Sequence, residues 1–457
     1  MSRPAGTIAR IPAAPPRALQ GMRDFLPERM ILRHWVIGQL RSVFESFGFE
    51  PLDTPAVEYA ETLMGKYGQE ADKLIYRFED RGGRAVGLRY DLTVPLARVV
   101  AMYPELPKPF KRYQMGPVWR AERPQKGRYR EFWQCDVDTV GTGSVLADAE
   151  LPLVVATALG RLGFRQYTIR INNRKVLSAL AETLGVEGEA TLALFRSLDK
   201  LDKIGVGGVK AELSERGLSE EVSGRLFDFV ATTGSNDDVL RGLRAHLGAH
   251  PRAAEGIAEL EQIAAALSAS GVPETSYRFD LSMIRGLDYY TGPIFETVVE
   301  EPKIGSLSGG GRYDGLIGLL SGRDVPATGT TVGLERIIDV IDDLGMAPTS
   351  LRRTVTEVLV TVFGPDTLPA SLGLARDLRG AGLRAELALT GDRLGNQLKY
   401  ASRRGIPFAA IVGPDEQAAG QVLVKNLGSG EQRSLARAAV AEELRRELAN
   451  AASGPDG

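Results

Sequence analysis

The sequence predicts an α+β protein of several domains, and three features of its 457 residues predict this class. Two stretches rich in strand signals, residues 84–138 and 277–299, are separated by residues 172–271, in which apolar side chains recur at helical spacing. From residue 355 onward strands and helices alternate, which is typical of a small doubly wound α/β domain. A chain of this length can bury the cores of two or three domains.

The composition excludes several classes of protein. With 43% hydrophobic and 25% charged residues the chain is an ordinary globular protein, and a net charge of -2 creates no general attraction for a polyanion, so any nucleic-acid contact must come from local clusters. A single cysteine, Cys135, excludes a disulfide framework, and the three histidines, His34, His246 and His250, have no zinc-site spacing, so no metal site is expected. Without a membrane-length apolar run or a secretory signal, we expect a cytoplasmic protein.

The first twenty residues have a composition of their own. They contain Arg3, Arg10 and Arg17, several prolines and alanines, and no acidic residue. A disordered tail over residues 1–20 is the expected reading, and an organellar transit peptide is the alternative.

The regular elements can be followed in order from there. Apolar residues recur at helical spacing from Ile31 to Phe47, until Gly48 ends the pattern, and the segment after it is extended. A Gly-rich turn is expected after residue 299. The apolar spacing i, i+3, i+4 and i+7 from Leu334 then predicts a helix that begins near Gly333.

The stretch RAERPQKGRYREF, residues 120–132, predicts a hairpin with a cationic loop. Side chains alternate along each strand, so the following strand has an apolar face and a polar face, the latter comprising Phe132, Gln134, Asp136 and Asp138. Arg120 and Glu122 share one face of the preceding strand, and the loop between the strands is longer than a tight hairpin needs. Guanidinium groups suit phosphate and a phenyl ring suits a base, but a merely solvated charged face remains the alternative at this stage.

Two further clusters contain residues that suit a binding site. IRGLDYYTGPIFE brings together Arg285, Asp288, Tyr289 and Tyr290, although a buried strand with a structural ion pair would also explain it. SLSGGGRYDGL places three glycines before Arg312, Tyr313 and Asp314, which allows the backbone to approach a ligand closely. The Lys-Ser/Thr pair of a P-loop is missing here, and GTGSVL lacks the context of a dinucleotide fingerprint.

Taken together, six segments resemble the histidyl-tRNA synthetase family, which consists of class II aminoacyl-tRNA synthetases. The segments are GMRDFLPERM, LRYDLTVPLAR, VWRAERPQKGRYREFWQCDVD, MIRGLDYYTGPIFE, GGGRYDGL and VGLERI. The resemblance implies an antiparallel catalytic core over residues 21–171 and 272–345, a helical insertion over 172–271 and an anticodon-binding α/β domain over 355–450. It also implies a homodimer formed through residues 41–55, with L-histidine, ATP accompanied by Mg²⁺, and tRNA(His) as partners, and no membrane.

The resemblance also assigns residues to the two small substrates. Arg120 and Arg285 are the expected catalytic residues, on opposite sides of the α-phosphate, and both also contact histidine. The ATP set adds Glu122, Arg128, Phe132 on the adenine and Arg336 on the γ-phosphate. The histidine set adds Asp91, Thr93 and Gln134 at the α-amino group, Asp138 and Tyr290 at the imidazole, and Tyr289 and Tyr313 along the wall. Asp91 and Asp138 stand where many bacterial members have glutamate, which leaves the depth of the pocket open.

The alternative function is that of a paralogue that does not charge tRNA and acts as a regulatory subunit of ATP phosphoribosyltransferase. Such paralogues typically lack the C-terminal α/β domain and have altered substrate contacts. This sequence has both the domain and the contact residues, so the ligase is the favoured prediction.

Overall fold

The computed structural model describes residues 16–64, 73–125, 127–284 and 289–452. The chain divides into two compact units, each with its own hydrophobic core. The first unit comprises Met1–Asp24 and Val36–Gly345, and the second comprises Phe25–Trp35 and Met346–Gly457.

The first helix, α1, contains residues of both units, because the boundary between Trp35 and Val36 falls inside it. The described elements of the first unit begin with α1. In chain order they are α1 (Pro27–Ser46), β1 (Glu50–Pro51), β2 (Val57–Tyr59), α2 (Ala60–Leu63), β3 (Arg77–Glu79), β4 (Ala85–Leu88), α4 (Thr93–Met102), β5 (Phe110–Trp119), β6 (Glu131–Val140), α5 (Val145–Arg161) and β7 (Thr168–Asn173). The second half of the unit contains α6 (Arg174–Thr183), α7 (Glu189–Leu198), α8 (Leu201–Glu215), α9 (Glu220–Val230), α10 (Asn236–Leu247), α11 (Pro251–Ala269), the 3-10 helix η1 (Glu274–Ser276), β8 (Tyr277–Phe279), β9 (Pro293–Val298), β10 (Ser308–Arg312), α12 (Asp314–Ser321), β11 (Ala327–Gly333) and α13 (Leu334–Asp343).

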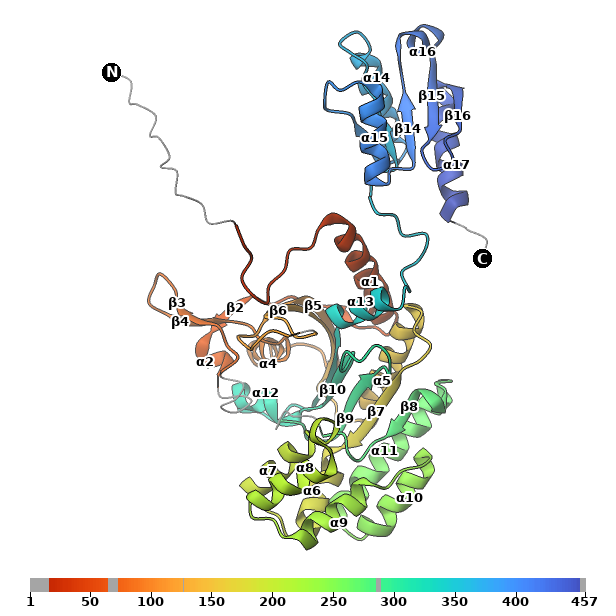
Figure 1. Ribbon diagram of the computed structural model, residues 1–457. Coiled ribbons are helices and arrows are strands. Elements are labelled where there is room, and N and C mark those ends of the chain that lie inside the picture. Colours follow the sequence, from red (N-terminus) through yellow and green to blue (C-terminus); the bar gives the residue numbers. More distant parts are fainter. Residues whose placement is uncertain (1–15, 65–72, 126, 285–288, 453–457) are drawn as a thin grey trace, which may run out of the picture. The chain divides into compact units, whose positions relative to one another are not determined.

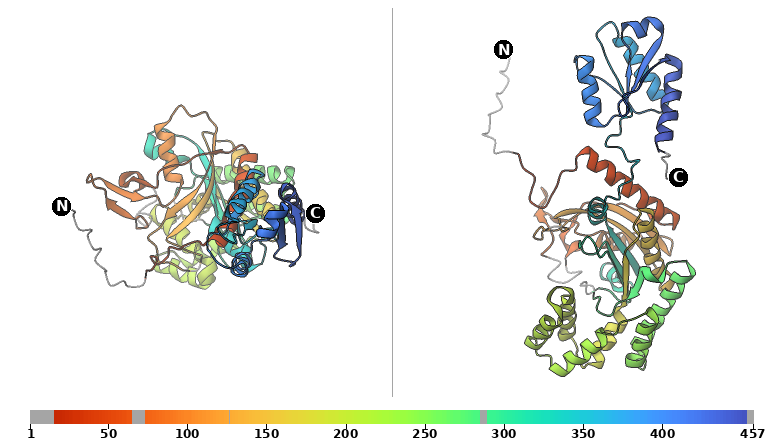
Figure 2. Two further views of the ribbon diagram at one scale, coloured as in Figure 1. Left: turned by 90° about the horizontal axis from the view of Figure 1, so that it is seen from above. Right: turned by 45° about the vertical axis from the view of Figure 1, so that its right-hand side comes forward.

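A curved eight-stranded sheet organises the first unit (Figure 1). Its order is β1-β5-β6-β11-β10-β9-β7-β8, and every pairing is antiparallel except the two at the edges, β1 with β5 and β7 with β8. Helices α5 and α13 pack against the outer face of this sheet, whereas α4 lies inside its curve (Figure 2). A small sheet of order β2-β4-β3 lies beside it. The predicted antiparallel core is therefore confirmed.

Strand β6 is buried on both faces, which its amino-acid pattern did not require. The apolar face packs into the core, and the polar face of Gln134, Asp136 and Asp138 is also buried. Buried carboxylates carry a desolvation cost unless they are paired, so this face is a strong indication of function.

Three local predictions were wrong. Strand β5 ends at Trp119, so Arg120 and Glu122 lie in the connection to β6 and not on the strand, although the Arg120 N–H still donates to the Arg130 carbonyl. Helix α4 interrupts the stretch predicted as mostly strand. The segment expected to be a Gly-rich turn is the central strand β10. Its glycines fit this strand because the backbone of β11 approaches so closely that a Cβ on Gly310 would lie 2.0 Å from the Gly329 carbonyl oxygen. The helix predicted near Gly333 is confirmed as α13.

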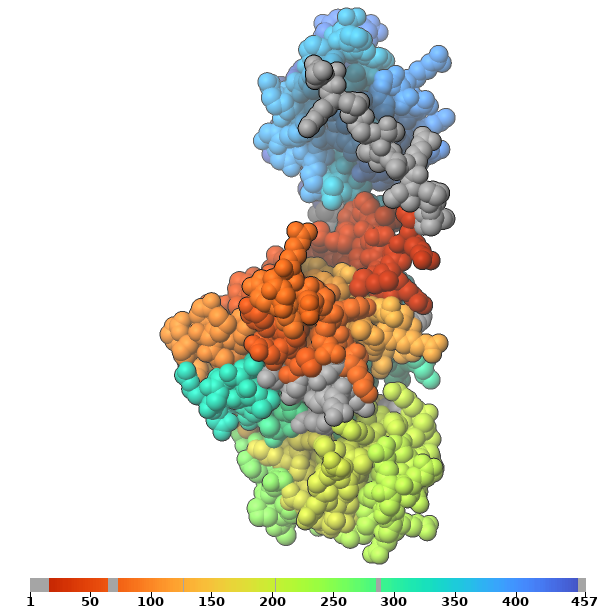
Figure 3. Space-filling view, turned by 90° about the vertical axis from the view of Figure 1, so that its left-hand side faces the viewer, coloured from red at the N-terminus to blue at the C-terminus, as the bar shows by residue number. Residues whose placement is uncertain are grey.

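Helices α6 to α11 follow each other without an intervening strand and form a separate lobe, yellow to green in Figure 3. Their starts follow from local chemistry: Ser219 caps α9, and Ser235 forms a capping box with Asp238 at α10. Leucine, isoleucine and valine side chains fill the contacts between these helices, as the helical periodicity predicts.

The second unit is an α/β domain with a five-stranded sheet of order β13-β12-β14-β15-β16. Its elements are β12 (Val358–Val360), α14 (Leu368–Gly380), β13 (Ala385–Leu387), α15 (Leu394–Arg404), β14 (Phe408–Ile411), α16 (Pro414–Ala419), β15 (Gln421–Asn426), β16 (Gln432–Ala436), the 3-10 helix η2 (Arg437–Ala439) and α17 (Val440–Ala452). The pairings of β12 are parallel, but β14, β15 and β16 pair antiparallel, so the sheet is mixed. The last predicted helix began too early, because Leu435 and Ala436 belong to β16.

Across the part of the chain that the structure describes, no helix combines the length and the apolar character needed to cross a membrane.

Candidate active site

A cavity of about 490 Å³ lies on the inner face of the large sheet of the first unit. Every described residue that the sequence predicted for the two small substrates lines it: Asp91, Thr93, Arg120, Glu122, Arg128, Phe132, Gln134, Asp138, Tyr289, Tyr290, Tyr313 and Arg336. Residues separated by more than two hundred positions therefore share one cavity. Arg285 and Asp288 lie outside the described residues.

The connection between β5 and β6 forms the cationic wall. The Arg120 Nε donates to the carbonyl of Tyr90 at 3.0 Å, and its guanidinium lies 5.0 Å from the centre of the Phe132 ring. Arg128 is half exposed, with its Nη1 3.6 Å from Oε2 of Glu122. A tethered arginine beside an aromatic ring suits a phosphate next to a base.

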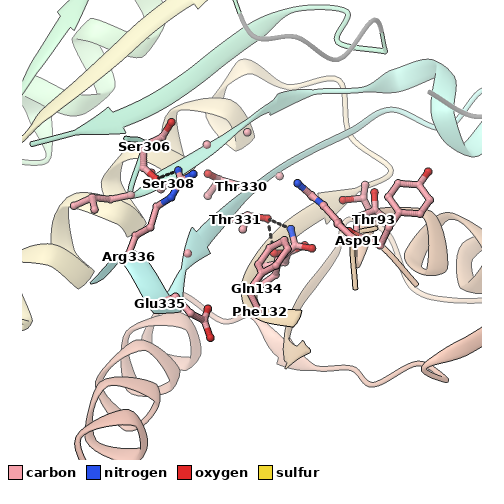
Figure 4. Close-up of a pocket in the computed structure, with 18 of the residues that line it drawn as sticks. Asp91, Thr93, Phe132, Gln134, Ser306, Ser308, Thr330, Thr331, Glu335 and Arg336 are labelled. Atoms are coloured by element: carbon pink, nitrogen blue, oxygen red, sulfur yellow. Dashed lines mark hydrogen bonds between the residues drawn. The ribbon is translucent and has the colours of Figure 1, made fainter. Parts of the chain in front are cut away.

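A second arginine reaches the cavity from the first turn of α13. The Arg336 Nη1 donates to the Ser306 carbonyl at 2.6 Å, and its Nε donates to the Gly127 carbonyl at 3.3 Å. Figure 4 shows this side chain pointing towards Ser306, away from the helix axis. A helix N-terminus carries a partial positive charge, so this side of the cavity favours an anion.

Across the cavity from Arg336 lie neutral and acidic groups (Figure 4). The Asp91 Oδ1 accepts a hydrogen bond of 3.1 Å from the Val94 N–H, which fixes the carboxylate at the start of α4, and Thr93 is the first residue of that helix. The Gln134 Nε2 donates to Thr331 Oγ1 at 3.1 Å, and Figure 4 shows the two side chains meeting across neighbouring strands. The Asp91 carboxylate, the Thr93 hydroxyl and the Oε1 atom of Gln134 can all accept hydrogen bonds, and such acceptors suit an ammonium group.

Asp138 occupies the floor of the cavity. Its Oδ2 lies 2.7 Å from Nη2 of Arg112 on β5, and its Oδ1 accepts a hydrogen bond from the Tyr313 hydroxyl. A Cβ at Gly329, its register partner on β11, would lie 1.9 Å from that Oδ1, so only glycine leaves room for the carboxylate. Burial raises the pKa of Asp138, and Arg112 and the Tyr313 hydroxyl oppose that shift.

Asp136 lies two residues earlier on the same face. Burial raises its pKa to about 7, with the charges of Asp138 and Asp91 adding to the effect and Arg112 opposing it. Its Oδ1 accepts a hydrogen bond from the Thr331 hydroxyl. Two carboxylates that share one guanidinium do not both ionise easily, and Asp138 has the direct contact with that guanidinium.

Three tyrosines close one side of the cavity. The Tyr289 hydroxyl donates to that of Tyr290 at 3.3 Å, and Tyr313 meets Tyr289 edge to face at 6.0 Å between ring centres. Burial raises the pKa of Tyr289 and Tyr313 well above the usual value, so both hydroxyls stay neutral and able to donate.

Several lining residues were not predicted from the sequence. Asp136 belongs to the polar face of β6, and the alternation of that strand was the signal that could have included it. Thr331 and Thr330 lie on β11, a strand that the sequence reading did not identify, and Glu335 precedes Arg336 on α13. Among the described residues no group of three or more His, Cys, Asp or Glu could hold a metal ion.

Comparison with known proteins agrees with this geometry. The model of the histidyl-tRNA synthetase family matches residues 21–337, and that of an anticodon binding domain matches residues 357–447. A histidine–tRNA ligase of Aeropyrum pernix is 46% identical over 420 residues, covering 91% of this chain and 95% of that protein. One of Gloeobacter violaceus is 45% identical over 447 residues, again covering 91% and 95%. The crystal structure of histidyl-tRNA synthetase from Nostoc sp. PCC 7120 superposes with a TM-score of 0.83 at 36% identity, covering 94% of this chain and 99% of that one.

The antiparallel sheet, the cationic wall and the polar floor of this cavity agree with the match to the family model. The first unit is therefore the catalytic domain of a class II aminoacyl-tRNA synthetase, a ligase of protein biosynthesis. Both the family model and the relatives narrow the class further. The chain belongs to the histidyl-tRNA synthetase family. The regulatory paralogue is less supported, because the relatives named here are ligases and the second unit matches an anticodon binding domain.

Proposed function

We propose that this ligase activates L-histidine with ATP to histidyl-adenylate and then transfers the histidyl group to the 3′ end of tRNA(His). The observation that carries the proposal is the shared cavity, which is lined by Arg120, Phe132 and Arg336 and also by Asp91, Gln134 and Asp138. The arginines and the aromatic ring suit a nucleoside triphosphate, and the acidic and amide groups suit a small amino acid.

The first step needs no general base from the protein. The substrate carboxylate is already ionised, and one of its oxygens forms a bond to the α-phosphorus while the bond from that phosphorus to pyrophosphate breaks. Catalysis then consists of aligning two anions and neutralising the charge that develops on the phosphoryl oxygens. Arginine suits this task because it stays protonated and binds two oxygens at once.

The resemblance to the family assigns each residue a role, and the shared cavity supports these assignments. Arg120 holds the α-phosphate and the histidine carboxylate, Phe132 stacks on adenine, and Arg336 holds the γ-phosphate from the start of α13. Glu122 and Arg128 complete the ATP contacts. Asp91, Thr93 and Gln134 bind the α-amino group, Asp138 and Tyr290 bind the imidazole, and Tyr289 and Tyr313 form the wall. Magnesium enters with ATP as part of the substrate.

Arg285, outside the described residues, is proposed as the second catalytic arginine, opposite Arg120. Removing one donor of this kind typically slows turnover by roughly 10² to 10³. Arg285→Ala is therefore expected to depress ATP–pyrophosphate exchange far more than histidine binding, and equal exchange rates in the variant and the parent would refute the role.

The deciding experiment is ATP–pyrophosphate exchange with each of the twenty amino acids in turn. Histidine is expected to stimulate exchange and the others are not, since a site that hydrogen-bonds its ligand rejects analogues without those groups by about 10⁴ to 10⁵. Stimulation by a different amino acid would overturn the substrate assignment.

The domain roles complete the proposal. Residues 21–171 and 272–345 form the catalytic core, residues 172–271 form a helical insertion that contacts RNA, and residues 355–450 read the anticodon. In the last of these, α15 and its flank carry Arg393, Lys399, Arg403 and Arg404, which suit an RNA backbone. Of the tail predicted over residues 1–20, residues 1–15 lie outside the described residues.

We also propose a cytoplasmic homodimer. The segment at residues 41–55 is the proposed dimer interface, and it contains the end of α1 and the short edge strand β1. Sedimentation of the full chain tests this assembly, and a monomer at micromolar concentration would contradict it.

A further inference from the structure

Arg112 is a fully buried arginine that the proposed substrate contacts do not include. It lies on β5 in direct register with Asp138 on β6, and its side chain has 0% exposure. Burying a guanidinium costs free energy unless charge and hydrogen bonds compensate, so an arginine in this position needs an explanation.

The contacts of Arg112 join two parts of the cavity. The same nitrogen, Nη2, lies 2.7 Å from Oδ2 of Asp138 and donates to the Leu92 carbonyl at 3.1 Å. Leu92 separates Asp91 from Thr93, the two residues proposed for the α-amino group. One guanidinium therefore connects the imidazole end of the site with the amino end.

Other structural bonds of Arg112 are few. Its Nε and Nη1 have no hydrogen-bond partner among the residues that the structure describes. An arginine retained only for stability would be expected to use its whole fork of donors. The pairing with Asp138 and the link to Leu92 are thus the described polar interactions that explain its burial.

The surroundings of Asp138 oppose its ionisation. Burial raises the pKa of Asp138, and Arg112 is the cation that lowers it, helped by the Tyr313 hydroxyl. Among the described residues, the other charged or titratable groups near this pair are Asp136 on the same strand, Asp91 before α4, Tyr289 behind Tyr313, and Arg89, a buried cation whose charge acts on Asp136. Arg112 is the cation that acts on Asp138 directly, so without Arg112 the described surroundings favour a neutral Asp138.

We propose that Arg112 is a positioning residue, which keeps the Asp138 carboxylate ionised and directed at the imidazole of histidine. This inference rests on the proposed function, because it takes the imidazole as the partner of Asp138. An ionised carboxylate accepts a charge-assisted hydrogen bond from an imidazole N–H, whereas a neutral acid would present a competing donor. Arg112 then acts on histidine recognition without touching the substrate.

The test compares Arg112→Gln with the parent in histidine-dependent ATP–pyrophosphate exchange. Near pH 6.5 we expect KM for histidine to rise roughly 10- to 100-fold, the value of one charge-assisted hydrogen bond, with KM for ATP nearly unchanged. At a higher pH, near 9, the ratio of the variant's KM for histidine to the parent's should be smaller, because rising pH favours the ionised form of Asp138 in the variant. The ratio cancels the titration of histidine itself.

Two controls separate positioning from stability. Lys111→Gln removes a cation from the neighbouring position of β5, where Lys111 pairs with Glu150, and should leave the KM ratio flat and near unity. Asp138→Asn should raise KM for histidine by a factor that does not vary with pH. The double variant Asp138→Asn, Arg112→Gln should have nearly the same KM for histidine as Asp138→Asn alone.

Arg112→Lys keeps the positive charge, and it is the variant that tests the proposal if Arg112→Gln does not fold. We expect its KM for histidine to stay within about threefold of the parent, since a lysine in contact still provides the cation. A folded lysine variant as impaired as Asp138→Asn would overturn the proposal, as would a glutamine variant with an unchanged or pH-independent ratio. If the parent itself showed no histidine-dependent exchange, the proposed function would fail instead.

Discussion

Among its described residues the first unit contains two arginine–aspartate pairs in which both side chains are buried, and they are built differently. Arg312, on β10, donates hydrogen bonds from all three guanidinium nitrogens. Nε and Nη2 donate to the carboxylate of Asp148 on α5, at 3.0 to 3.1 Å and 2.5 Å. Nη1 donates to the Thr142 carbonyl and to Asp314, and Nη2 also donates to the Ser144 carbonyl. Arg112 uses only Nη2, for Asp138 and the Leu92 carbonyl, among the described residues.

The difference separates an architectural pair from one beside a ligand. The Arg312–Asp148 pair fastens α5 to the sheet and leaves no donor over, so its cost of burial is offset internally. The Arg112–Asp138 pair lies at the floor of the cavity, where the Asp138 carboxylate is part of the lining. A saturated pair should therefore affect stability when it is broken, and an unsaturated pair should affect binding.

Asp148→Ala is expected to have the largest effect on stability. Removing one member of a buried pair leaves the other charge uncompensated and costs about 3–5 kcal/mol. Urea unfolding of the full chain, followed by a signal from the first unit, measures this loss. A cost below about 1 kcal/mol, the range of exposed pairs, would contradict the distinction.

Gly329→Ala should act on the other pair without changing any charge. The new Cβ would fall 1.9 Å from Asp138 Oδ1, so the carboxylate must turn away from Tyr313 and the cavity. We expect KM for histidine to rise roughly tenfold or more, with a stability loss of about 1–3 kcal/mol from overpacking. Steady-state exchange kinetics and urea unfolding measure the two effects.

The matched control for that substitution is Gly315→Ala in α12. No atom lies within 4 Å of the Cβ that it adds. Its KM for histidine should equal that of the parent, and a similar rise in both variants would show that the effect at Gly329 is not specific.

Asp136→Asn should change how stability depends on pH. Because burial raises the pKa of Asp136 to about 7, the folded state holds a proton that the unfolded state has already lost above its ordinary pKa near 4. The stability that this group contributes is therefore present at low pH and lost as pH rises through about 7. The Tm of Asp136→Asn relative to the parent should increase between about pH 5 and pH 8, and a constant difference would rule the shift out.

The smallest effect is expected at an exposed pair in the second unit. Asp377 accepts from Arg437 at 2.8 Å, but both side chains are about two-fifths exposed. Solvent screens such a pair, so Asp377→Ala should cost at most about 1 kcal/mol, measured by urea unfolding. A loss similar to that of Asp148→Ala would mean that burial does not decide the cost.

The sequence predicted much of the fold and most of the cavity because the relevant patterns are local. Alternation along β6 identified the polar face with Gln134 and Asp138, and the spacing from Leu334 identified α13. The arrangement between strands was not readable in this way. Arg112 lies on β5 and meets Asp138 only through the register of two strands, and β10 looked like a turn because its glycines lack strand propensity. Tertiary packing, which no window of sequence contains, decides both.

The glycines of the sheet have a consequence for the cohesion of the first unit. Gly311 on β10 and Gly329 on β11 are register partners, and a Cβ on Gly311 would lie 3.0 Å from the ring of Tyr290. Two adjacent central strands thus contribute no side chain to the sheet face at this row, where other proteins place valine or isoleucine. In the proposed complex with histidine, the imidazole ring would provide the packing that those side chains provide elsewhere, so substrate binding would also complete the core of the first unit.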